Sequence, residues 1–416
     1  MNLRVLVLTH FFPPETGAAS HRVAAVVAAL VRAGHAVTVV TTLPSWPTGV
    51  RPARYRGAVV VREVLEGASV RRVWTFASPR FVPRNRLATM LTSAFGSLAY
   101  VATMRPRYDV VYVSSPPITL ALPALAASFL RRAPLVVDVR DVYPEVAVRL
   151  GEWRAGGRLV RIVGRVADML YARASAIVTV TRACRDEIVA RGVAAAKVRV
   201  VPNGFDAVAP SPAAPYEKRP GEFTVSYTGN MGLANGVGVL VDAAKLLADD
   251  GRFRFVLVGD GAQRDQIAAR VAAEGIENVT MLGALSRADT FAVQQCSDIC
   301  AVPLRRNLTD SLPTKLIDAL ALGRPVIVCA LGEARRFVED ADAGVAVEPE
   351  DPRALAAALA ALVDDAAALE RFGRNGRAFV EERYEREALA AQIAREIEGA
   401  ALRSSAQREA PAPRNA

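Results

Sequence analysis

The sequence predicts an α/β protein of two doubly wound domains, each built on a parallel sheet. Its 416 residues exceed what one ordinary domain holds, since domains usually contain about 100 to 200 residues. Short β-branched runs alternate with amphipathic stretches along the chain, which is typical of strands separated by crossover helices. A proline-rich stretch near the middle separates two such alternating series.

The first half contains the first alternating series. A strand is expected at 3–9, a helix at 22–32 and a second strand at 35–41. The later strands are short and rich in β-branched residues, which favours buried positions in a parallel sheet. They are expected at residues 110–113, 135–139, 176–181 and 198–201. Residues 1–206 are therefore expected to form the N-terminal domain.

The second half repeats this pattern after an expected linker, residues 207–222, which contains four prolines. The second domain is expected at 223–385, followed by a helix at 386–402 and a disordered tail at 403–416. The strands of this domain are expected at residues 224–228, 253–259, 279–282, 299–302, 325–329 and 344–347. Its helices are expected at residues 237–248, 263–273, 314–322 and 353–362.

The composition argues against several other classes of protein. Apolar residues make up 52% of the chain and charged residues 23%, as in a globular rather than a disordered protein. The four cysteines form no CxxC pair, and no histidine lies at ligand spacing, so neither a disulfide framework nor a zinc site is expected. No DxD-type carboxylate pair ends a strand, so no metal is expected. No cleavable signal is expected either, because the apolar run at 3–9 is too short, and a reducing cytoplasm is the simpler inference.

Positive charge is concentrated in residues 51–107. This segment contains eleven arginines and two glutamates, a local charge of +9 in a chain of +10. Within it, residues 87–104 carry no charge, but their threonines, serines and glycine disfavour a membrane-spanning helix. Two interpretations stay open: a buried helix of the fold, or an interfacial helix that contacts anionic lipid while the arginines bind head groups. No nucleic-acid-binding motif accompanies the arginines, so nucleic acid is not expected as a partner.

The segment 310–327, DSLPTKLIDALALGRPVI, carries the most specific signal. A helix over 314–322 puts Asp318 about one turn after Lys315, with Asp310 in the loop before it. The first backbone amides of that helix and the Lys315 ammonium can hold a diphosphate, and a carboxylate one turn later can bind ribose hydroxyls. A solvated helix start is the alternative. The residues expected at this site are Asp310, Leu312, Pro313, Thr314, Lys315 and Asp318.

Two glycine-containing loops are expected near this helix. One follows the strand 224–228 and reads TGNMG, and the other follows the strand 253–259 and reads VGDG. Parallel sheets bind ligands beyond the carboxyl ends of their strands, where glycines let backbone amides approach a phosphate. Plain tight turns are the alternative. The expected binding residues are Gly229, Asn230, Gly232, Gly259, Asp260 and Gly261.

In the first half, polar residues follow two of the expected strands. Gly17 ends the run FFPPETG and is expected to bring backbone close to a ligand. Asp141 follows the strand 135–139, where a carboxylate can accept a proton from an acceptor hydroxyl if its pKa is suitable. His10 lies at the carboxyl end of the first strand, and both a turn histidine and a catalytic histidine stay open.

Taken together, these motifs resemble the family 4 glycosyltransferases along nearly the whole chain. KVRVVPNGFD, SYTGNMG, FVLVGDG and PTKLIDALALGRPVI occur in family order, and FFPPETGAASHR and DVRDVYPE resemble the branch that builds bacterial surface polysaccharides, including fucosaminyl-type transferases. The resemblance implies the GT-B fold, in which two Rossmann-like domains face a cleft and a C-terminal helix closes back on the N-terminal domain. It also implies a retaining reaction, with a nucleotide-diphosphate sugar bound by the C-terminal domain and an acceptor bound by the N-terminal one.

The chain departs from the family pattern at three places. The E-x7-E of the family appears here as Asp310 and Asp318, each one methylene shorter. Asn235 stands about where many relatives carry a basic residue, so the diphosphate charge is expected to rest on Lys315, on backbone amides and on an arginine such as Arg287 or Arg305. Arg140 and Asp141 occupy the strand end where many relatives have a histidine, so whether Asp141, Arg140 or His10 acts on the acceptor stays open.

The resulting hypothesis is a glycosyltransferase of cell-surface polysaccharide biosynthesis. It would move a hexose or N-acetylhexosamine from a nucleotide-diphosphate sugar to a lipid-linked or membrane-proximal glycan, in the cytoplasm and peripherally on the inner face of the membrane. Asp310 would position sugar hydroxyls, Asp318 would hold ribose, and Asp141 or His10 would orient the acceptor. A sugar-nucleotide epimerase of the same architecture and a catalytically degraded scaffold that binds nucleotide sugar are the alternatives.

Overall fold

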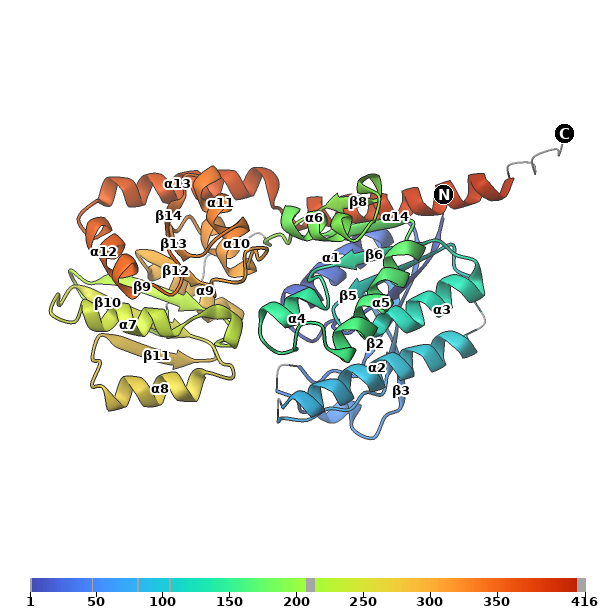
Figure 1. The fold of residues 1–416 in the computed structure, drawn as a ribbon, viewed down its shortest axis with the longest axis horizontal. Coiled ribbons are helices and arrows are strands. Elements are labelled where there is room, and N and C mark those ends of the chain that lie inside the picture. The colour runs from blue at the N-terminus through green and yellow to red at the C-terminus, as the bar shows by residue number, and fades with distance from the viewer. Residues whose placement is uncertain (1, 47, 81, 105, 207–213, 410–416) are drawn as a thin grey trace. The chain divides into compact units, whose positions relative to one another are not determined.

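The computed structural model describes residues 2–46, 48–80, 82–104, 106–206 and 214–409, which form two compact units (Figure 1). Unit 1 comprises Met1–Asn203 together with Arg386–Ala416, and unit 2 comprises Gly204–Glu385. The chain therefore returns to unit 1 after it completes unit 2. Each unit contains one sheet, and the two are described separately.

Unit 1 contains an eight-stranded sheet in the order β3-β4-β2-β1-β5-β6-β7-β8. The six strands predicted for the first half are present. They are β1 (Arg4–Leu8), β2 (Ala36–Thr42), β5 (Val110–Ser115), β6 (Leu135–Val139), β7 (Ala176–Thr179) and β8 (Val198–Val200). The hairpin of β3 (Val60–Leu65) and β4 (Ala68–Val73) was not predicted, because its arginines hide the apolar signal of a strand. β4 and the six predicted strands run parallel, and β3 pairs antiparallel to β4 at the edge.

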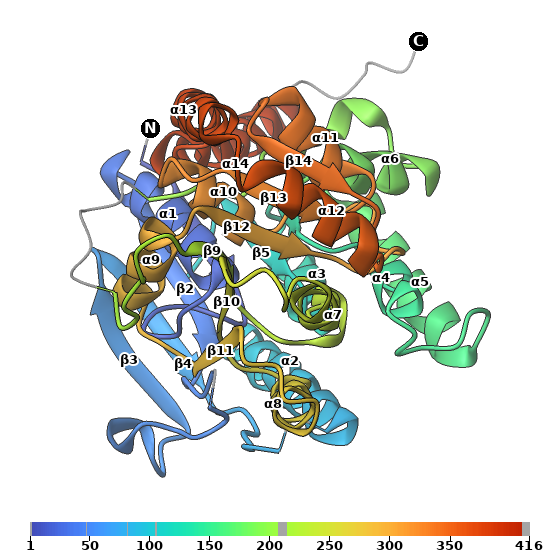
Figure 2. The same cartoon turned by 90° about the vertical axis from the view of Figure 1, so that its left-hand side faces the viewer.

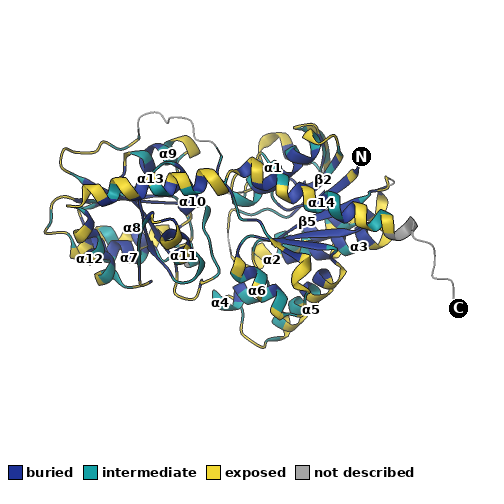
Figure 3. Cartoon of the chain, turned by 90° about the horizontal axis from the view of Figure 1, so that it is seen from above, coloured by how far each residue is buried: buried dark blue, intermediate teal, exposed yellow. Residues whose placement is uncertain are grey.

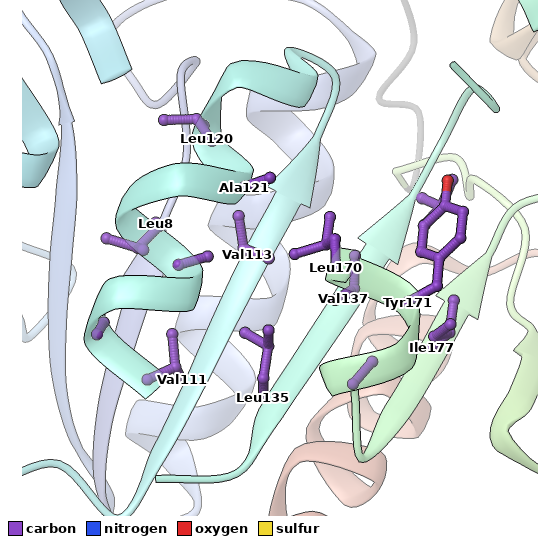
Figure 4. Close-up of a cluster of buried hydrophobic side chains, with 14 of the residues drawn as sticks. Leu8, Val111, Val113, Leu120, Ala121, Leu135, Val137, Leu170, Tyr171 and Ile177 are labelled. Atoms are coloured by element: carbon purple, nitrogen blue, oxygen red, sulfur yellow. The ribbon is translucent and has the colours of Figure 1, made fainter. Parts of the chain in front are cut away.

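Helices cover both faces of this sheet. Alternate strand residues point to opposite faces, so Val5 and Val7 pack against one helical layer while Leu6 and Leu8 pack against the other. Figure 4 shows part of the second cluster, with Leu8 and Val113 near Leu170. The first layer contains α1 (Ala18–Arg32) and α14 (Arg386–Glu409). The second layer contains α2 (Pro83–Thr103), α3 (Ala121–Arg131) and α5 (Arg158–Arg173). The short helices α4 (Glu145–Arg149) and α6 (Arg182–Ala190) complete the unit.

Helix α2 contains most of the uncharged stretch found in the sequence. Ser93, Ala94, Ser97 and Val101 are buried, which confirms that one side of this helix belongs to the fold. Leu87, Leu91 and Phe95, which lie outside this buried side, remain exposed. Within the described ranges, no helix combines the length and the apolar character that crossing a bilayer requires.

The C-terminal helix packs on α1, as the family resemblance implied. It does not end at residue 402. Ala400 and Ala401 are still buried, and α14 continues to Glu409. The expectation of a disordered tail was therefore wrong for residues 403–409, and residues 410–416 lie outside the described part of the chain.

Unit 2 contains a six-stranded parallel sheet in the order β11-β10-β9-β12-β13-β14, with buried strands between exposed helix surfaces (Figures 2 and 3). All six predicted strands are present. They are β9 (Phe223–Thr228), β10 (Phe253–Val258), β11 (Val279–Gly283), β12 (Ile299–Pro303), β13 (Val326–Cys329) and β14 (Gly344–Val347). The helices are α7 (Gly238–Leu246), α8 (Arg264–Ala273), α9 (Arg287–Cys296), α10 (Thr314–Ala321), α11 (Glu333–Asp340), α12 (Pro352–Leu362) and α13 (Ala366–Arg383). The chain runs outward from β9 to β11 and then restarts at β12, so the strand order reverses between β9 and β12.

Part of the expected linker packs on unit 2. Ala214 and Tyr216 contact a small apolar cluster that includes Val256 and Val293. The Lys218 ammonium donates to the Asp298 carboxylate at 2.7 Å. Residues 214–222 are therefore part of this unit, and residues 207–213 lie outside the described ranges.

Candidate functional site

The candidate site of unit 2 lies where the strand order reverses. Open parallel sheets bind ligands at such a point, because the loops after the two neighbouring strands diverge there. The loop after β9 contains Gly229 and Asn230, and the loop after β12 leads into α10. The structure thus brings together two segments that the sequence analysis had selected independently.

Lys315, near the N-terminus of α10, reaches the loop after β9. Its ammonium donates to Tyr227 Oη at 2.8 Å and to Asn235 Oδ1 at 3.0 Å. It also lies 4.1 Å from the centroid of the Tyr227 ring. A Cβ atom built on Gly229 would lie only 3.1 Å from the Lys315 Nζ, so the glycine leaves room for the ammonium.

Tyr227 holds the lysine and the glycine loop together, a role that the sequence analysis missed. Its hydroxyl donates to the Asn230 carbonyl at 2.7 Å and accepts the hydrogen bond from Lys315. Asn235, noted in the sequence as a replacement for a basic residue, is the second acceptor for Lys315. The sequence signal that could have identified this role is a tyrosine near the C-terminal end of a buried strand, two residues before the glycine loop.

The loops after β9 and β10 pack too closely for side chains. A Cβ atom on Gly259 would lie 1.8 Å from the Gly229 carbonyl oxygen, and one on Gly261 would lie 2.4 Å from Asn230 Oδ1. The Met231 amide donates to the Asp260 carbonyl at 2.8 Å across the same contact. Both glycines have positive φ, 137° and 151°. Loop packing therefore already requires glycine at 259 and 261, whether or not a ligand binds there.

The remaining loop residues have separate structural roles. Gly232 is the N-terminal boundary of a short turn, and a Cβ there would lie 3.2 Å from Asn230 Oδ1. The Asp260 carboxylate accepts from the Gly261 amide at 2.7 Å, which fixes the turn after β10.

Lys315 is a cation without a carboxylate partner within ion-pair distance in the described residues. Burial lowers its pKa to about 7. An anion beside the ammonium would favour the charged form and would supply the missing counter-charge. The geometry is therefore that of an anion site.

The other predicted binding residues of this segment precede or follow Lys315 within a few positions of the sequence. Pro313 is the N-cap of α10, and Thr314 is its first residue. Leu312 packs partly buried against the core cluster below the helix. Asp318 follows Lys315 by three positions on α10, so the two are neighbours on the helix surface.

Asp310 lies in the loop before α10, and that loop is held by the next turn of the sheet. The Glu333 amide donates to the Thr309 carbonyl at 2.8 Å. A Cβ atom on Gly332 would lie 2.0 Å from the Thr309 oxygen. Gly332 thus sets the position of the segment that carries Asp310, which was not foreseen from the sequence.

In unit 1, His10 lies at the carboxyl end of β1 and is buried. Its Nδ1 lies 3.0 Å from Ser93 Oγ on α2, and its ring packs edge-on to Phe11. Burial first, and then the Arg140 charge, lower the pKa of His10 to about 4. The imidazole is therefore neutral near pH 7, where it can exchange hydrogen bonds but is a weak base.

Asp141 and Gly17 lie in the loops after β6 and β1. The Asp141 side chain is exposed. The neighbouring Tyr143 is partly buried, and this burial, followed by the negative charge of Asp141, raises the pKa of Tyr143 to about 12. Gly17 is the N-cap of α1 at φ 128°, and a Cβ atom there would have nothing within 4 Å. Gly17 is needed for its backbone angle, and the space beside it is open to a ligand.

A buried ion pair beneath these loops was also missed. Arg22 of α1 donates from Nε and Nη2 to the Asp138 carboxylate, both at 2.9 Å. The same guanidinium donates to the carbonyls of Val201 and Pro202, and Asp138 also accepts from the Tyr112 hydroxyl at 2.8 Å. This network fixes α1, β5, β6 and the segment of Val201 and Pro202 after β8 relative to one another. Within the described ranges, no cluster of side chains has the composition of a metal site.

Two family models match the chain in succession. Residues 17–204 match the model described as a glycosyl transferase 4-like domain, and residues 222–365 match the model described as glycosyl transferases group 1. The first match covers most of unit 1, and the second covers most of unit 2 and includes Lys315.

Two curated relatives match along most of their length. A glycogen synthase of Mycobacterium tuberculosis is 26% identical over 90% of this chain and 89% of the relative. A putative colanic acid biosynthesis glycosyl transferase of Escherichia coli, WcaI, is 24% identical over 95% of this chain and all of the relative.

A solved structure extends the comparison to the fold. HepE of Anabaena, in complex with UDP-glucose, matches with a TM-score of 0.66 and 20% identity. The match covers 96% of this chain and 100% of that chain. At this level of identity the likeness shows the fold alone, a GT-B fold with two Rossmann-like parallel sheets.

Proposed function

The chain belongs to the family 4 glycosyltransferases of GT-B fold, and on this basis we propose that it glycosylates a lipid-linked or membrane-proximal glycan. The donor is a nucleotide-diphosphate sugar, and the sugar is a hexose or an N-acetylhexosamine transferred with retention. The product belongs to a cell-surface polysaccharide, as the name of the Escherichia coli relative suggests by analogy. A fucosaminyl-type activity is the narrower form of the same proposal, motivated by FFPPETGAASHR and DVRDVYPE.

The observation that carries the proposal is the Lys315 ammonium beside the glycine loop, which has neutral hydrogen-bond acceptors but no carboxylate partner among the described residues. A leaving nucleoside diphosphate gains negative charge as the glycosidic bond breaks, so a fixed cation there stabilises the transition state. Lys315 and the amides that begin α10 would bind this diphosphate. Because HepE was solved with UDP-glucose, a UDP-sugar is the first donor to test.

The carboxylates have complementary roles in this proposal. Asp318, three positions after Lys315, would accept hydrogen bonds from ribose hydroxyls. Asp310 would position the hydroxyls of the donor sugar from the loop before α10. Each is shorter than the glutamate of the family pattern, so the ligand hydroxyls would approach the backbone more closely.

The acceptor would bind to unit 1, in the loops at the carboxyl ends of β1 and β6. Asp141 is the exposed carboxylate of that region, and His10 is neutral near pH 7. We expect Asp141 to accept a hydrogen bond from the acceptor hydroxyl and His10 to orient it. A lipid-linked acceptor would bring the enzyme to the cytoplasmic face of the membrane.

Replacing Lys315 with alanine tests the donor site. The variant should bind UDP more weakly by roughly 1.5 to 3 kcal/mol, the range for a charge-assisted hydrogen bond. Calorimetric titration with UDP, GDP and ADP measures this effect and selects the base. Lys245→Ala is the matched control, because Lys245 is an exposed lysine of unit 2 whose partner is Glu274.

Unchanged affinity in Lys315→Ala would remove this lysine from the site. Product analysis with the preferred UDP-, GDP- or ADP-sugar then separates the activities. Transfer that requires an added glycan acceptor supports the proposal. Formation of an epimeric nucleotide sugar, or binding without turnover of any donor, would contradict it.

A further inference from the structure

Exposed large apolar side chains are distributed unequally between the two units. Within the described residues there are eighteen, of which seventeen lie in unit 1, and Leu246 is the exception. Nine of the seventeen lie on α2, α3 and α5. Apolar side chains gathered on one side of a unit indicate a surface that binds something other than water.

The three helices form a continuous layer on one face of the unit 1 sheet. Helix α3 lies between α2 and α5 and contacts both (Figure 1). We call the outer surface of this layer the α2–α3–α5 face. Its exposed apolar residues are Leu87, Leu91 and Phe95 on α2, Leu122, Phe129 and Leu130 on α3, and Leu159, Ile162 and Met169 on α5.

The sequence spacing of these residues places those of α2 along one side of that helix, and Ile162 and Met169 along one side of α5. Leu87, Leu91 and Phe95 follow one another at intervals of four, so they lie along one side of α2. Ile162 and Met169 are seven positions apart, which is two turns of α5. The most exposed residue, Phe129, has 79% of its surface accessible, and Ile162 has 58%.

The same face is strongly basic. Helices α2, α3 and α5 contain seven arginines and a single carboxylate, that of Asp168. Asp168 is already bonded to Arg191 at 2.6 Å. On α5, four exposed arginines flank Ile162 and Met169, and none of the four has an ion-pair partner among the described residues. They are Arg158, Arg161, Arg165 and Arg173.

We propose that the α2–α3–α5 face binds a bilayer containing anionic lipid. The apolar side chains enter the head-group region, and the unpaired guanidinium groups bind lipid phosphates. Long arginine side chains suit this depth, because their stems lie along apolar surface while the charged ends reach the head groups. The inference rests on the proposed function only in that a lipid-linked acceptor gives the contact a purpose.

The chemistry of the face favours lipid over a macromolecular partner. A protein partner would have to place a carboxylate against each buried arginine, because an unpaired buried charge is costly, whereas the phosphates of an anionic bilayer supply counter-charge over the whole contact. Nucleic acid would be read by basic residues interleaved with stacking aromatics. Phe95 and Phe129 are the aromatic residues in the exposed apolar set, and the other seven are aliphatic or Met.

The structure also corrects the membrane segment inferred from the sequence. Arg72, counted within the basic segment 51–107, is fully buried. Its Nε donates to Glu63 at 2.5 Å, and it lies 5.6 Å from the Tyr55 ring centroid. Conversely, the basic residues of α3 and α5 lie outside that segment. The proposed contact is therefore a face of three helices rather than one stretch of chain.

Sedimentation of the full chain with phosphatidylcholine vesicles, with and without phosphatidylglycerol, tests the proposal. The wild type should bind only the anionic vesicles, and less as salt increases. Ile162→Glu/Met169→Glu should lose binding, because two carboxylates would then face the lipid. Replacing Arg158, Arg161 and Arg165 with glutamine should lower partition about a hundredfold, since each basic residue near an anionic surface contributes about a fivefold factor.

Two control variants of unit 2 test whether a loss of vesicle binding comes from the α2–α3–α5 face itself or from a change in net charge or in an exposed apolar residue anywhere on the protein. Leu246→Glu places a carboxylate on the exposed apolar residue of unit 2, and Arg264→Gln/Arg353→Gln/Arg374→Gln removes the same charge from unit 2. Both controls should bind vesicles like the wild type. UDP affinity, measured in parallel, should be unchanged in every variant and shows that unit 2 is folded; tryptophan fluorescence shows the same for unit 1.

Three results would overturn the inference. They are equal binding to neutral vesicles, retained binding by Ile162→Glu/Met169→Glu, and loss of binding by the unit 2 controls. Binding that short duplex DNA displaces, and that only the arginine variant loses, would assign the face to a polyanion instead. A wild type that binds UDP but no vesicle refutes this inference and leaves the proposed function standing.

Discussion

Replacing Asp138 with asparagine should strongly destabilise unit 1. The Asp138 side chain is fully buried at the end of β6, and the Arg22 side chain is 4% exposed. In the wild type the carboxylate accepts two hydrogen bonds from Arg22 and one from Tyr112. The variant keeps the shape of the side chain but leaves the guanidinium cation buried against a neutral amide.

The size of the effect follows from this burial. Removing one partner of a buried ion pair costs about 3 to 5 kcal/mol, because the remaining charge stays out of water. Arg22 retains the carbonyls of Val201 and Pro202, which still solvate part of its charge. We therefore expect a loss near the lower end, about 3 kcal/mol. Tyr112→Phe removes one neutral donor and should cost only about 1 kcal/mol.

Urea unfolding followed by tryptophan fluorescence measures this loss in the right unit. The three tryptophans, at positions 46, 74 and 153, all belong to unit 1, so their signal is independent of unit 2. The double variant Arg22→Met/Asp138→Leu should be less unstable than the sum of the single changes, because no unpaired charge remains. A loss for Asp138→Asn no larger than that for Tyr112→Phe, or strict additivity in the double variant, would refute the reasoning.

Two further predictions concern unit 2. Gly259→Ala should destabilise unit 2 and weaken UDP binding, because its Cβ would lie 1.8 Å from the Gly229 carbonyl oxygen. The control is Gly275→Ala, where φ is positive but the space is open, and it should cost only about 1 kcal/mol. Equal losses of stability in thermal unfolding of the two variants would contradict the packing argument. UDP-glucose affinity should fall as pH rises through about 7, by up to about tenfold per pH unit, because the Lys315 ammonium loses its proton there. An affinity that does not depend on pH, or one that depends on pH equally in Lys315→Ala, would contradict the role of this charge.

Lys315 also links pH to the stability of the empty protein. Its pKa is lower in the folded state than the usual value of 10.5, so the unfolded chain binds more protons between about pH 7 and pH 10.5. The contribution of this residue to stability therefore increases as pH rises through that window. Donor affinity and stability respond to pH in opposite directions, and titration of Lys315 explains both.

The burial of individual arginines could not be predicted from the sequence. The local charge of the segment 51–107 was visible in the sequence, but Arg72 could not be separated from its exposed neighbours. Its partner Glu63 lies nine positions earlier, on the strand that pairs antiparallel with β4. Only strand pairing brings the two side chains together, and charge counting along the chain contains no information about it.

The candidate site shows the same division. The sequence identified Lys315 and the glycine loop as separate motifs, each with a plausible local alternative. It did not identify Tyr227 as their link, because Tyr227 and Lys315 are 88 positions apart and meet only at the reversal of strand order. Likewise, Arg22 reads as one charged position of an amphipathic helix until α1 packs over Asp138.

Twelve strands and the helix that carries Lys315 were determined by the sequence itself, because β-branched runs, glycine turns and helical periodicity act over a few neighbouring residues. The chemistry available to the site, a lysine, two carboxylates and glycine loops, was determined in the same way. The tertiary structure decided which groups meet: the partners of Lys315, the burial of Arg72 and the joining of three helices into one basic, apolar face. Those outcomes depend on contacts between residues far apart in the chain, which form only when parallel strands align their ends and helices cover them.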